Sequence, residues 1–191
     1  MNNGFFAMLF RMKHIERWGI MHSLIPDQLS THSLEVGFIA HALSEIGNKK
    51  FGKRYDCSLI TMKAIYHDVP EIFTGDIPTP VKYYSEDTKQ AYSAVETASL
   101  NKLTEMLPEE FRSTYSCIFE YTEDEKRLIK AADRISAYIK CLEEKNYGNR
   151  EFDIAGDRLL DAIKTMACPE ADYFLDNFLE PFGYPIDSIL Q

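Results

Sequence analysis

The spacing of apolar residues along the chain is the feature that most restricts its fold. Between residues 32 and 48 the apolar positions recur every three or four residues, as they do on one face of a helix. The same spacing returns at 57–68 and 124–146, and no alternation typical of a strand persists. The sequence therefore predicts an all-α protein, with further helices near 4–14, 85–106, 109–120, 151–167 and 170–180 and a proline-rich connection at 70–84.

Four polar side chains on three of these segments are candidates for a metal site. His32 lies one turn before the apolar stripe of its helix and is therefore expected to point inward. His67 and Asp68 stand side by side after an apolar run, and Asp133 flanks the stripe of 124–146. Imidazole nitrogens and carboxylate oxygens bind catalytic divalent cations, and one cation would pair groups that are costly to bury alone. Taken alone, a His-Asp pair is more often a buried histidine bonded to its neighbouring carboxylate.

Two helix ends are expected close to these side chains. Ser30 or Thr31 is suited to cap the first helix, because a hydroxyl accepts a hydrogen bond from a free backbone N–H. The second helix is expected over 57–68, where Pro70 stops it, which places the His-Asp pair at its C-terminus. The connection 70–84 follows, and its carboxylates cluster beside the candidate ligands, so we expect this connection to be functional.

Short motifs follow one another in a characteristic order along most of the chain. They are Arg17-Trp18, Ser30-Thr31-His32-Ser33, Tyr66-His67-Asp68, Glu71, Thr74-Gly75-Asp76, Pro78-Thr79-Pro80-Val81-Lys82-Tyr83 and Lys130-Ala131-Ala132-Asp133. In this order they resemble the HD-domain phosphohydrolases, and within them the bacterial 5'-deoxynucleotidases, from about Met8 to Phe182. The resemblance implies a single HD domain over residues 1–191, a helical bundle with the metal site between its helices.

The resemblance also implies roles for individual residues. It assigns proton handling and water positioning to Glu71. It assigns nucleotide recognition to Arg17, Trp18 and Asp76, with His32 also contacting the substrate. The implied metal ligands are His32, His67, Asp68 and Asp133. One divalent cation is expected, of Co, Mn, Fe, Zn or Ni, since nitrogen and oxygen ligands suit all of these. The family usually has an acidic residue before its first ligand histidine, where this chain has Thr31, which changes the hydrogen bonding expected around that histidine.

The activity implied by the resemblance is hydrolysis of deoxyribonucleoside 5'-monophosphates by a homodimeric enzyme. A bound cation would lower the pKa of water from about 15.7 toward about 7. Glu71 would orient that water or protonate the leaving 5' oxygen, while Arg17 neutralises charge on the phosphoryl group. Asp76 is expected to accept a hydrogen bond from the 3' hydroxyl, and Trp18 to fill the space that a 2' hydroxyl would need.

Other functions remain open from the sequence. The same four ligands serve HD proteins that cleave phosphodiesters or nucleoside triphosphates, although the flanking residues favour the monophosphatase. A non-catalytic nucleotide-binding sensor ranks third, because such a protein would be expected to lack a ligand and this chain has all four. Without the resemblance, Arg17 and Trp18 would be read as a surface arginine beside a core indole. Guanidinium groups nevertheless suit phosphate oxygens, and indole faces suit sugars or bases.

Charge and cysteine content limit the partners and the location. The 191 residues carry a formal charge of −9, with a sequence pI near 5.1, which disfavours binding of polymeric nucleic acid. The apolar run at 5–10 is too short to span a membrane. We therefore expect a cytoplasmic protein with neither a membrane nor a polymeric nucleic acid as partner. Four distant cysteines are expected to be reduced core residues: Cys57, Cys117, Cys141 and Cys168.

The remaining histidines and acidic clusters are expected to be structural or exposed. Histidines without a partner pattern are His14, His22 and His41. Acidic clusters expected on solvated helix faces and in caps are Glu109-Glu110, Glu123-Asp124-Glu125 and Glu143-Glu144.

Overall fold

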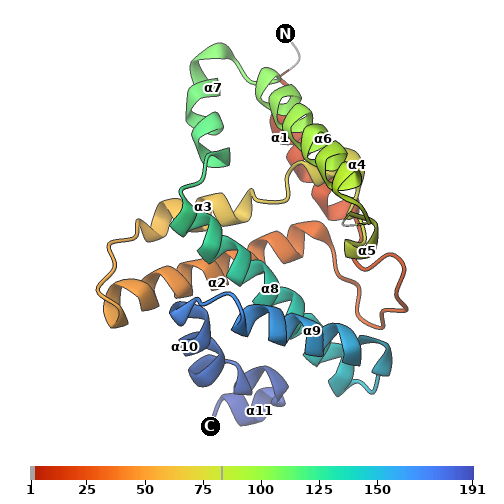
Figure 1. The fold of residues 1–191 in the computed structure, drawn as a ribbon, viewed down its shortest axis with the longest axis vertical. Helices are drawn as coiled ribbons and strands as arrows, with labels where there is room; N and C mark the ends of the chain where they lie inside the picture. The colour runs from red at the N-terminus through yellow and green to blue at the C-terminus, as the bar shows by residue number, and fades with distance from the viewer. Residues whose placement is uncertain (1–2, 83) are drawn as a thin grey trace. The chain divides into compact units, whose positions relative to one another are not determined.

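The computed structural model describes residues 3–82 and 84–191, so Tyr83 of the motifs lies outside the described residues. Within the described part of the chain, the regular elements are α-helices and short 3-10 helices. Extended backbone pairs there at one isolated bridge, between Glu16 and Gln28. Figure 1 shows the order of the helices, and the predicted all-α fold is confirmed. The chain divides into two compact units, which are described one at a time.

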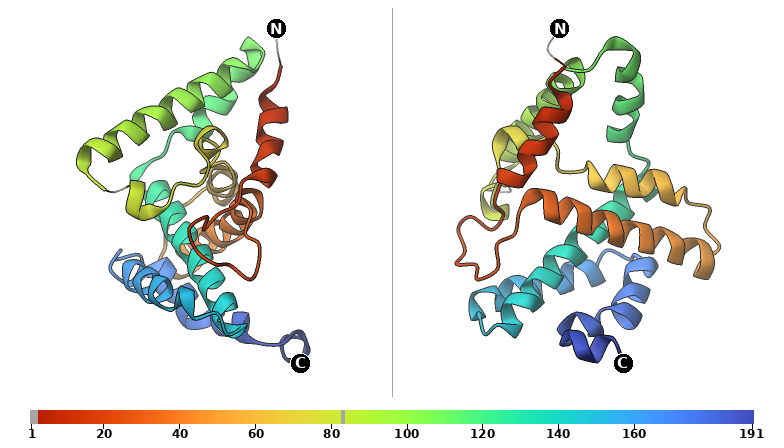
Figure 2. Two further views of the ribbon diagram at one scale, coloured as in Figure 1. Left: turned by 90° about the vertical axis from the view of Figure 1, so that its right-hand side faces the viewer. Right: turned by 180° about the vertical axis from the view of Figure 1, so that it is seen from behind.

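Unit 1 comprises Met1–His22, Pro26–Ser33 and Tyr66–Glu120. Its elements are α1 (Phe5–Leu9), η1 (Phe10–His14), the start of α2 (Leu29–Lys50), α4 (Glu71–Thr74), α5 (Thr79–Lys82), α6 (Glu86–Glu105), α7 (Glu109–Ser116) and η2 (Cys117–Phe119). Helix α1 contacts α6 near the C-terminal end of α6, as Figure 2 shows. The buried core of this unit consists of Phe5, Met12, Leu29, Val69, Leu103 and Leu107. Because Val69 directly follows the predicted His-Asp pair, burial of its side chain holds that pair in place.

Unit 2 comprises Ser23–Ile25, Leu34–Ile65 and Tyr121–Gln191. Its elements are the rest of α2, α3 (Cys57–Ile65), α8 (Glu123–Asn146), η3 (Arg150–Phe152), α9 (Asp153–Lys164), α10 (Pro169–Phe178), η4 (Glu180–Gly183) and α11 (Ile186–Ile189). Helix α8 packs against α9. The apolar stripes predicted for α2 and α8 are buried in its core, among them Val36, Ile39, Leu43, Leu128, Ala132 and Ile135. Gly37 permits the close approach of α3, because a Cβ there would lie 2.7 Å from Ile65 Cγ1.

The start of α2 differs from the prediction. The helix begins at Leu29, so Ser30 and Thr31 lie inside it and neither caps it from outside. Leu29 is fully buried in the core of unit 1, and this burial favours a helix that starts before the predicted position. The backbone N–H of His32 is therefore already bonded, to the Gln28 carbonyl at 3.0 Å.

Most other expectations hold, with local exceptions. The connection 70–84 contains the short helices α4 and α5, and the C-terminal elements η4 and α11 were not predicted. The four cysteines are free; Cys141 and Cys168 are buried as expected, whereas Cys57 is half-buried and Cys117 is exposed. His14, His22 and His41 are exposed, as predicted. Among the described residues, no helix combines the length and apolarity needed to cross a bilayer.

Candidate active site

The predicted ligands His67 and Asp68 lie in a turn that follows α3, not in a helix end. Helix α3 ends at Ile65 instead of continuing to 68. Beyond Ile65 the chain continues as turns, in which the Val69 N–H donates to the Tyr66 carbonyl, three residues back, at 3.2 Å. The Glu71 N–H donates to the Asp68 carbonyl at 3.0 Å, and α4 begins at Glu71. The corrected helix end therefore places all three side chains on one short segment.

Three of the four predicted ligands come together in unit 1. The distance from His67 Nε2 to Asp68 Oδ2 is 3.0 Å, and His32 Nε2 lies 3.6 Å from the same oxygen. The ligand atoms of these three residues all lie within 4.8 Å of one another, and His32 is fully buried, as predicted. Ligand atoms that share one cation at about 2.1 Å stand roughly 3 to 3.5 Å apart. The cluster therefore suits one divalent ion.

The charge of Asp68 is suited to cation binding. Burial alone would raise the pKa of this carboxyl, but His67, His32 and Arg17 together hold the pKa well below its usual range. Asp68 is therefore ionised at neutral pH, which is the form that binds a metal. Asp133, the fourth predicted ligand, is half-buried on α8 in unit 2, and its contribution to a metal site stays a prediction.

Glu71 is suited to handle a proton. Its Oε2 atom is buried and has no hydrogen-bond partner among the described residues. Burial, with the negative charges of Asp68 and Asp76, raises the pKa of the Glu71 carboxyl to about 9. In the cation-free protein Glu71 therefore carries a proton at neutral pH, as a general acid must.

The residues predicted to bind the nucleotide also meet within unit 1. The Trp18 N–H donates to Asp76 Oδ2 at 3.0 Å, although the two residues are 58 positions apart. The Arg17 guanidinium carbon lies 5.9 Å from the centre of the Trp18 ring. Trp18 has a φ of 63°, which is rare for a bulky residue, and strained backbone of this kind concentrates at functional sites.

Two residues that had no predicted role act on these groups: Asp27 bonds to two of them, and the positive charge of Lys82 lowers the pKa of the Glu71 carboxyl against the larger effects that raise it. Asp27 accepts hydrogen bonds from the side chains of both Arg17 and Trp18. Lys82 forms an ion pair with Glu96 at 2.7 Å. Burial alone would lower the pKa of the Lys82 ammonium group, but the hydrogen bond and the charge of Glu96 raise that pKa above its ordinary value. Lys82 belongs to the motif that runs from Pro78 to Tyr83, so the sequence contained a signal for it, whereas no spacing pattern indicated Asp27.

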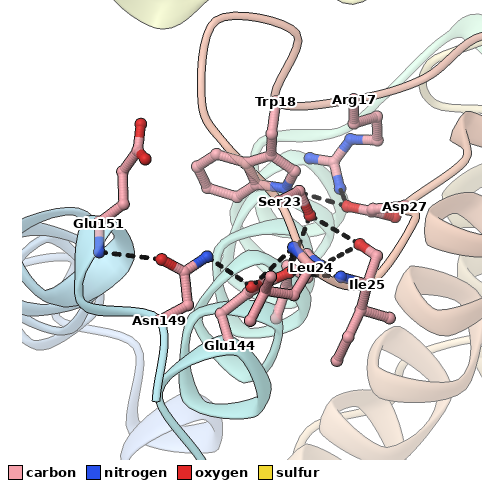
Figure 3. Close-up of polar contacts among 10 residues, drawn as sticks. Arg17, Trp18, Ser23, Leu24, Ile25, Asp27, Glu144, Asn149 and Glu151 are labelled. Carbon is pink, nitrogen blue, oxygen red and sulfur yellow. Dashed lines mark hydrogen bonds and ion pairs between the residues drawn. The ribbon is translucent and has the colours of Figure 1, made fainter. Parts of the chain in front are cut away.

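Glu144 overturns the expectation of a solvated helix face, because the structure buries it completely. Within unit 2 its carboxylate accepts hydrogen bonds from Ser23 Oγ and from the next two backbone N–H groups, at 2.8 to 3.1 Å (Figure 3). Lys140, one turn earlier on α8, forms an ion pair with it, and Asn149 Nδ2 donates at 2.7 Å. The helix position alone did not reveal that residues 23–25 cover this face.

Comparison with known proteins identifies close relatives over nearly the whole chain. A family model described as 5'-deoxynucleotidase YfbR-like matches residues 4–182. The 5'-deoxynucleotidase of Vibrio parahaemolyticus is 45% identical over 188 residues, which cover 97% of this chain and 97% of the relative. The 5'-deoxynucleotidase YfbR of Escherichia coli is 42% identical over 190 residues, which cover 98% of this chain and 96% of the relative.

Solved structures share the fold at lower identity. An HD-domain phosphohydrolase from Listeria innocua matches with a TM-score of 0.81 at 23% identity, over 93% of this chain and 87% of that chain. The cyanophage S-2L HD phosphohydrolase DatZ, bound to dA and one catalytic Zn2+ ion, matches with a TM-score of 0.67 at 17% identity, over 91% and 95%. Because the family model spans residues 4–182, the chain belongs to the YfbR-like 5'-deoxynucleotidase family.

Proposed function

We propose that this protein hydrolyses deoxyribonucleoside 5'-monophosphates to a deoxynucleoside and phosphate, with one divalent cation as cofactor. The observation that carries the proposal is the assembly, within unit 1, of a His-His-Asp cluster and of contacts among the nucleotide-binding motifs. Relatives that are 42% and 45% identical bear the name 5'-deoxynucleotidase, which supports the same substrate class.

The proposed metal ligands are His32, His67, Asp68 and Asp133. Two imidazole nitrogens and an ionised carboxylate within 4.8 Å fit Co, Mn, Fe, Zn or Ni. Zinc is kept among these because DatZ is bound to one catalytic Zn2+ ion. When bound, such a cation supplies positive charge that lowers the pKa of water and neutralises phosphoryl oxygens.

Glu71 is proposed to protonate the leaving group. Attack of a water oxygen on phosphorus breaks the bond to the 5' oxygen, and that oxygen takes the proton of the Glu71 carboxyl. The proton lost by the attacking water then returns to the Glu71 carboxylate, so the residue is regenerated. In the cation-free protein, burial and the negative charges of Asp68 and Asp76 raise the pKa of this carboxyl to about 9, and a bound cation would lower that pKa.

Arg17, Trp18 and Asp76 are proposed to select the substrate. The guanidinium of Arg17 suits the phosphate oxygens, because its N–H groups donate in a planar fork. Asp76 Oδ2 accepts the Trp18 N–H at 3.0 Å, and we assign its other oxygen to the 3' hydroxyl of the sugar. Trp18 is proposed to occupy the space of a 2' hydroxyl, so that ribonucleotides are excluded sterically.

Chromatographic separation of the reaction products, together with release of inorganic phosphate from the monophosphates, tests this function. Metal-free protein, supplied with each candidate cation in turn, is assayed with 5' mono-, di- and triphosphates, 3' monophosphates and cyclic dinucleotides. Deoxyribonucleoside 5'-monophosphates are expected to be hydrolysed fastest. Faster cleavage of triphosphates or cyclic dinucleotides would favour the two other HD activities, and nucleotide binding without any cleavage would favour a sensor.

We also propose that residues 1–191 act as one HD domain within a cytoplasmic homodimer. The family model spans residues 4–182 and therefore includes parts of both compact units. Sedimentation equilibrium tests the oligomeric state, because a dimer has twice the chain mass of 22.0 kDa.

A further inference from the structure

One carboxylate oxygen connects the two side chains that are proposed to recognise the nucleotide. Asp27 Oδ2 accepts a hydrogen bond from Arg17 Nη1 at 2.9 Å and another from Trp18 Nε1 at 3.0 Å (Figure 3). The side chains of Arg17 and Asp27 are 11% and 9% exposed, so little solvent competes for these bonds. Hydrogen bonds to a charged acceptor are stronger than neutral ones, and their geometry is more closely defined.

The backbone adds to this restraint. The Arg17 N–H donates to the Asp27 carbonyl at 2.8 Å, which fixes the two residues relative to each other. Trp18 is then held at two points, since Asp27 accepts its indole N–H and Asp76 accepts its backbone N–H. These contacts retain Trp18 at a φ of 63°, a conformation that a bulky residue rarely adopts unless its surroundings impose it.

The contact with Asp27 leaves Arg17 able to bind an anion. A guanidinium has five N–H donors, and Asp27 engages the Nη1 end. The Nε atom of Arg17 is buried and has no hydrogen-bond partner among the described residues. Because Nε and Nη2 share one edge of the guanidinium, Asp27 holds the group from one side while the other edge suits two oxygens of a phosphate.

We propose that Asp27 is a positioning residue, which fixes Arg17 for the 5' phosphate and Trp18 for the deoxyribose. This inference rests on the proposed function, and it adds that one carboxylate sets both the affinity for the nucleotide and the discrimination between sugars. Without Asp27, both side chains regain rotamer freedom that substrate binding must then remove.

The fluorescence of Trp18 tests this role without any assay of activity, because the chain contains one tryptophan. In metal-free protein, Asp27→Ala is expected to increase acrylamide quenching of Trp18 about twofold or more. Asp27→Asn retains an acceptor oxygen without the charge, so its acrylamide quenching should lie between those of the unmodified protein and Asp27→Ala. If Asp27→Ala does not fold, Asp27→Asn replaces it in the test. Glu16→Gln is the matched control: it removes one negative charge from an exposed side chain of the same segment and should quench like the unmodified protein.

Kinetics supply the second measurement. Asp27→Ala is expected to raise KM for dAMP about tenfold or more, to change kcat less, and to reduce the preference for dAMP over AMP. Unchanged quenching of Trp18 in Asp27→Ala would overturn the proposal. A constant KM would also overturn it, because Asp27 would then not affect nucleotide binding. A lower KM would overturn it as well, because Asp27 would then compete with the phosphate for Arg17. If the unmodified protein cleaved no deoxynucleotide, the proposed function would fail, while the fluorescence would still test whether Asp27 holds Trp18.

Discussion

Removing the carboxylate of Glu144 should destabilise the protein strongly, although sequence position suggested a solvated residue. Its side chain is fully buried, and the partner Lys140 is only 6% exposed. The variant Glu144→Ala leaves that ammonium group without its counter-ion and removes the acceptor for Ser23, two backbone N–H groups and Asn149. Breaking a buried pair from one side costs about 3 to 5 kcal/mol. For a chain of this size, that corresponds to a Tm lower by about 10 °C.

Urea unfolding followed by circular dichroism measures this loss. Glu151→Gln is the control: its side chain is exposed and its backbone N–H alone takes part in the network, so it should change stability by less than about 0.5 kcal/mol. The double variant Lys140→Met/Glu144→Leu should be more stable than Glu144→Leu alone, because no unpaired charge remains. A loss below about 1 kcal/mol for Glu144→Ala would refute the reasoning.

The pH dependence of Glu144 offers an independent check on the same network. Burial would raise the pKa of its carboxyl, but Lys140, the Ile25 N–H, Asn149 and the Leu24 N–H together hold it well below the ordinary value. A depressed pKa stabilises the fold above the unfolded-state pKa, and the stabilisation is lost as pH falls. The stability difference between the unmodified protein and Glu144→Ala should therefore narrow below about pH 4. A constant difference down to pH 2.5 would contradict the assigned cause.

Three predictions concern the candidate active site. Asp68→Asn should lose both bound cation and turnover, as measured by metal analysis and phosphate release, and an active metal-free variant would contradict the ligand assignment. Glu71→Gln should retain the cation and bind dAMP while kcat falls by about 10² or more. Because the protonated carboxyl acts as the acid, kcat of the unmodified protein should fall as pH rises through the pKa of Glu71, which is about 9 without a cation and lower with one. This decrease of kcat at high pH should be absent in Glu71→Gln. Asp76→Ala should raise KM and weaken the preference for dAMP over AMP, and an unchanged KM would remove its role at the sugar.

The parts of the structure that depend on local sequence were predictable. The spacing that buried Val36, Ile39 and Leu43 also placed His32 inward, because one helical periodicity governs all of these side chains. The resemblance based on the order of the motifs predicted that His32, His67 and Asp68 share one site, and the structure places them in one cluster.

The errors arose where distant contacts decide the outcome. The burial of Glu144 depends on residues 23–25, far away in the chain, and Asp27 is defined by hydrogen bonds across a loop that has no periodicity. The helix end before His67 was misplaced for a different reason: a proline two residues past residue 68 is compatible with a helix that ends there, so Pro70 alone did not reveal the end of α3 at Ile65.

Titration of metal-free protein with Co2+ tests the central claim most directly, with bound metal and phosphate release from dAMP recorded on the same sample. Both quantities should rise together to a plateau at one equivalent of cation per site, with AMP hydrolysed far more slowly, and neither should rise in Asp68→Asn. Full activity before any metal is bound, or an equal plateau in Asp68→Asn, would contradict a mechanism that depends on one cation at this cluster.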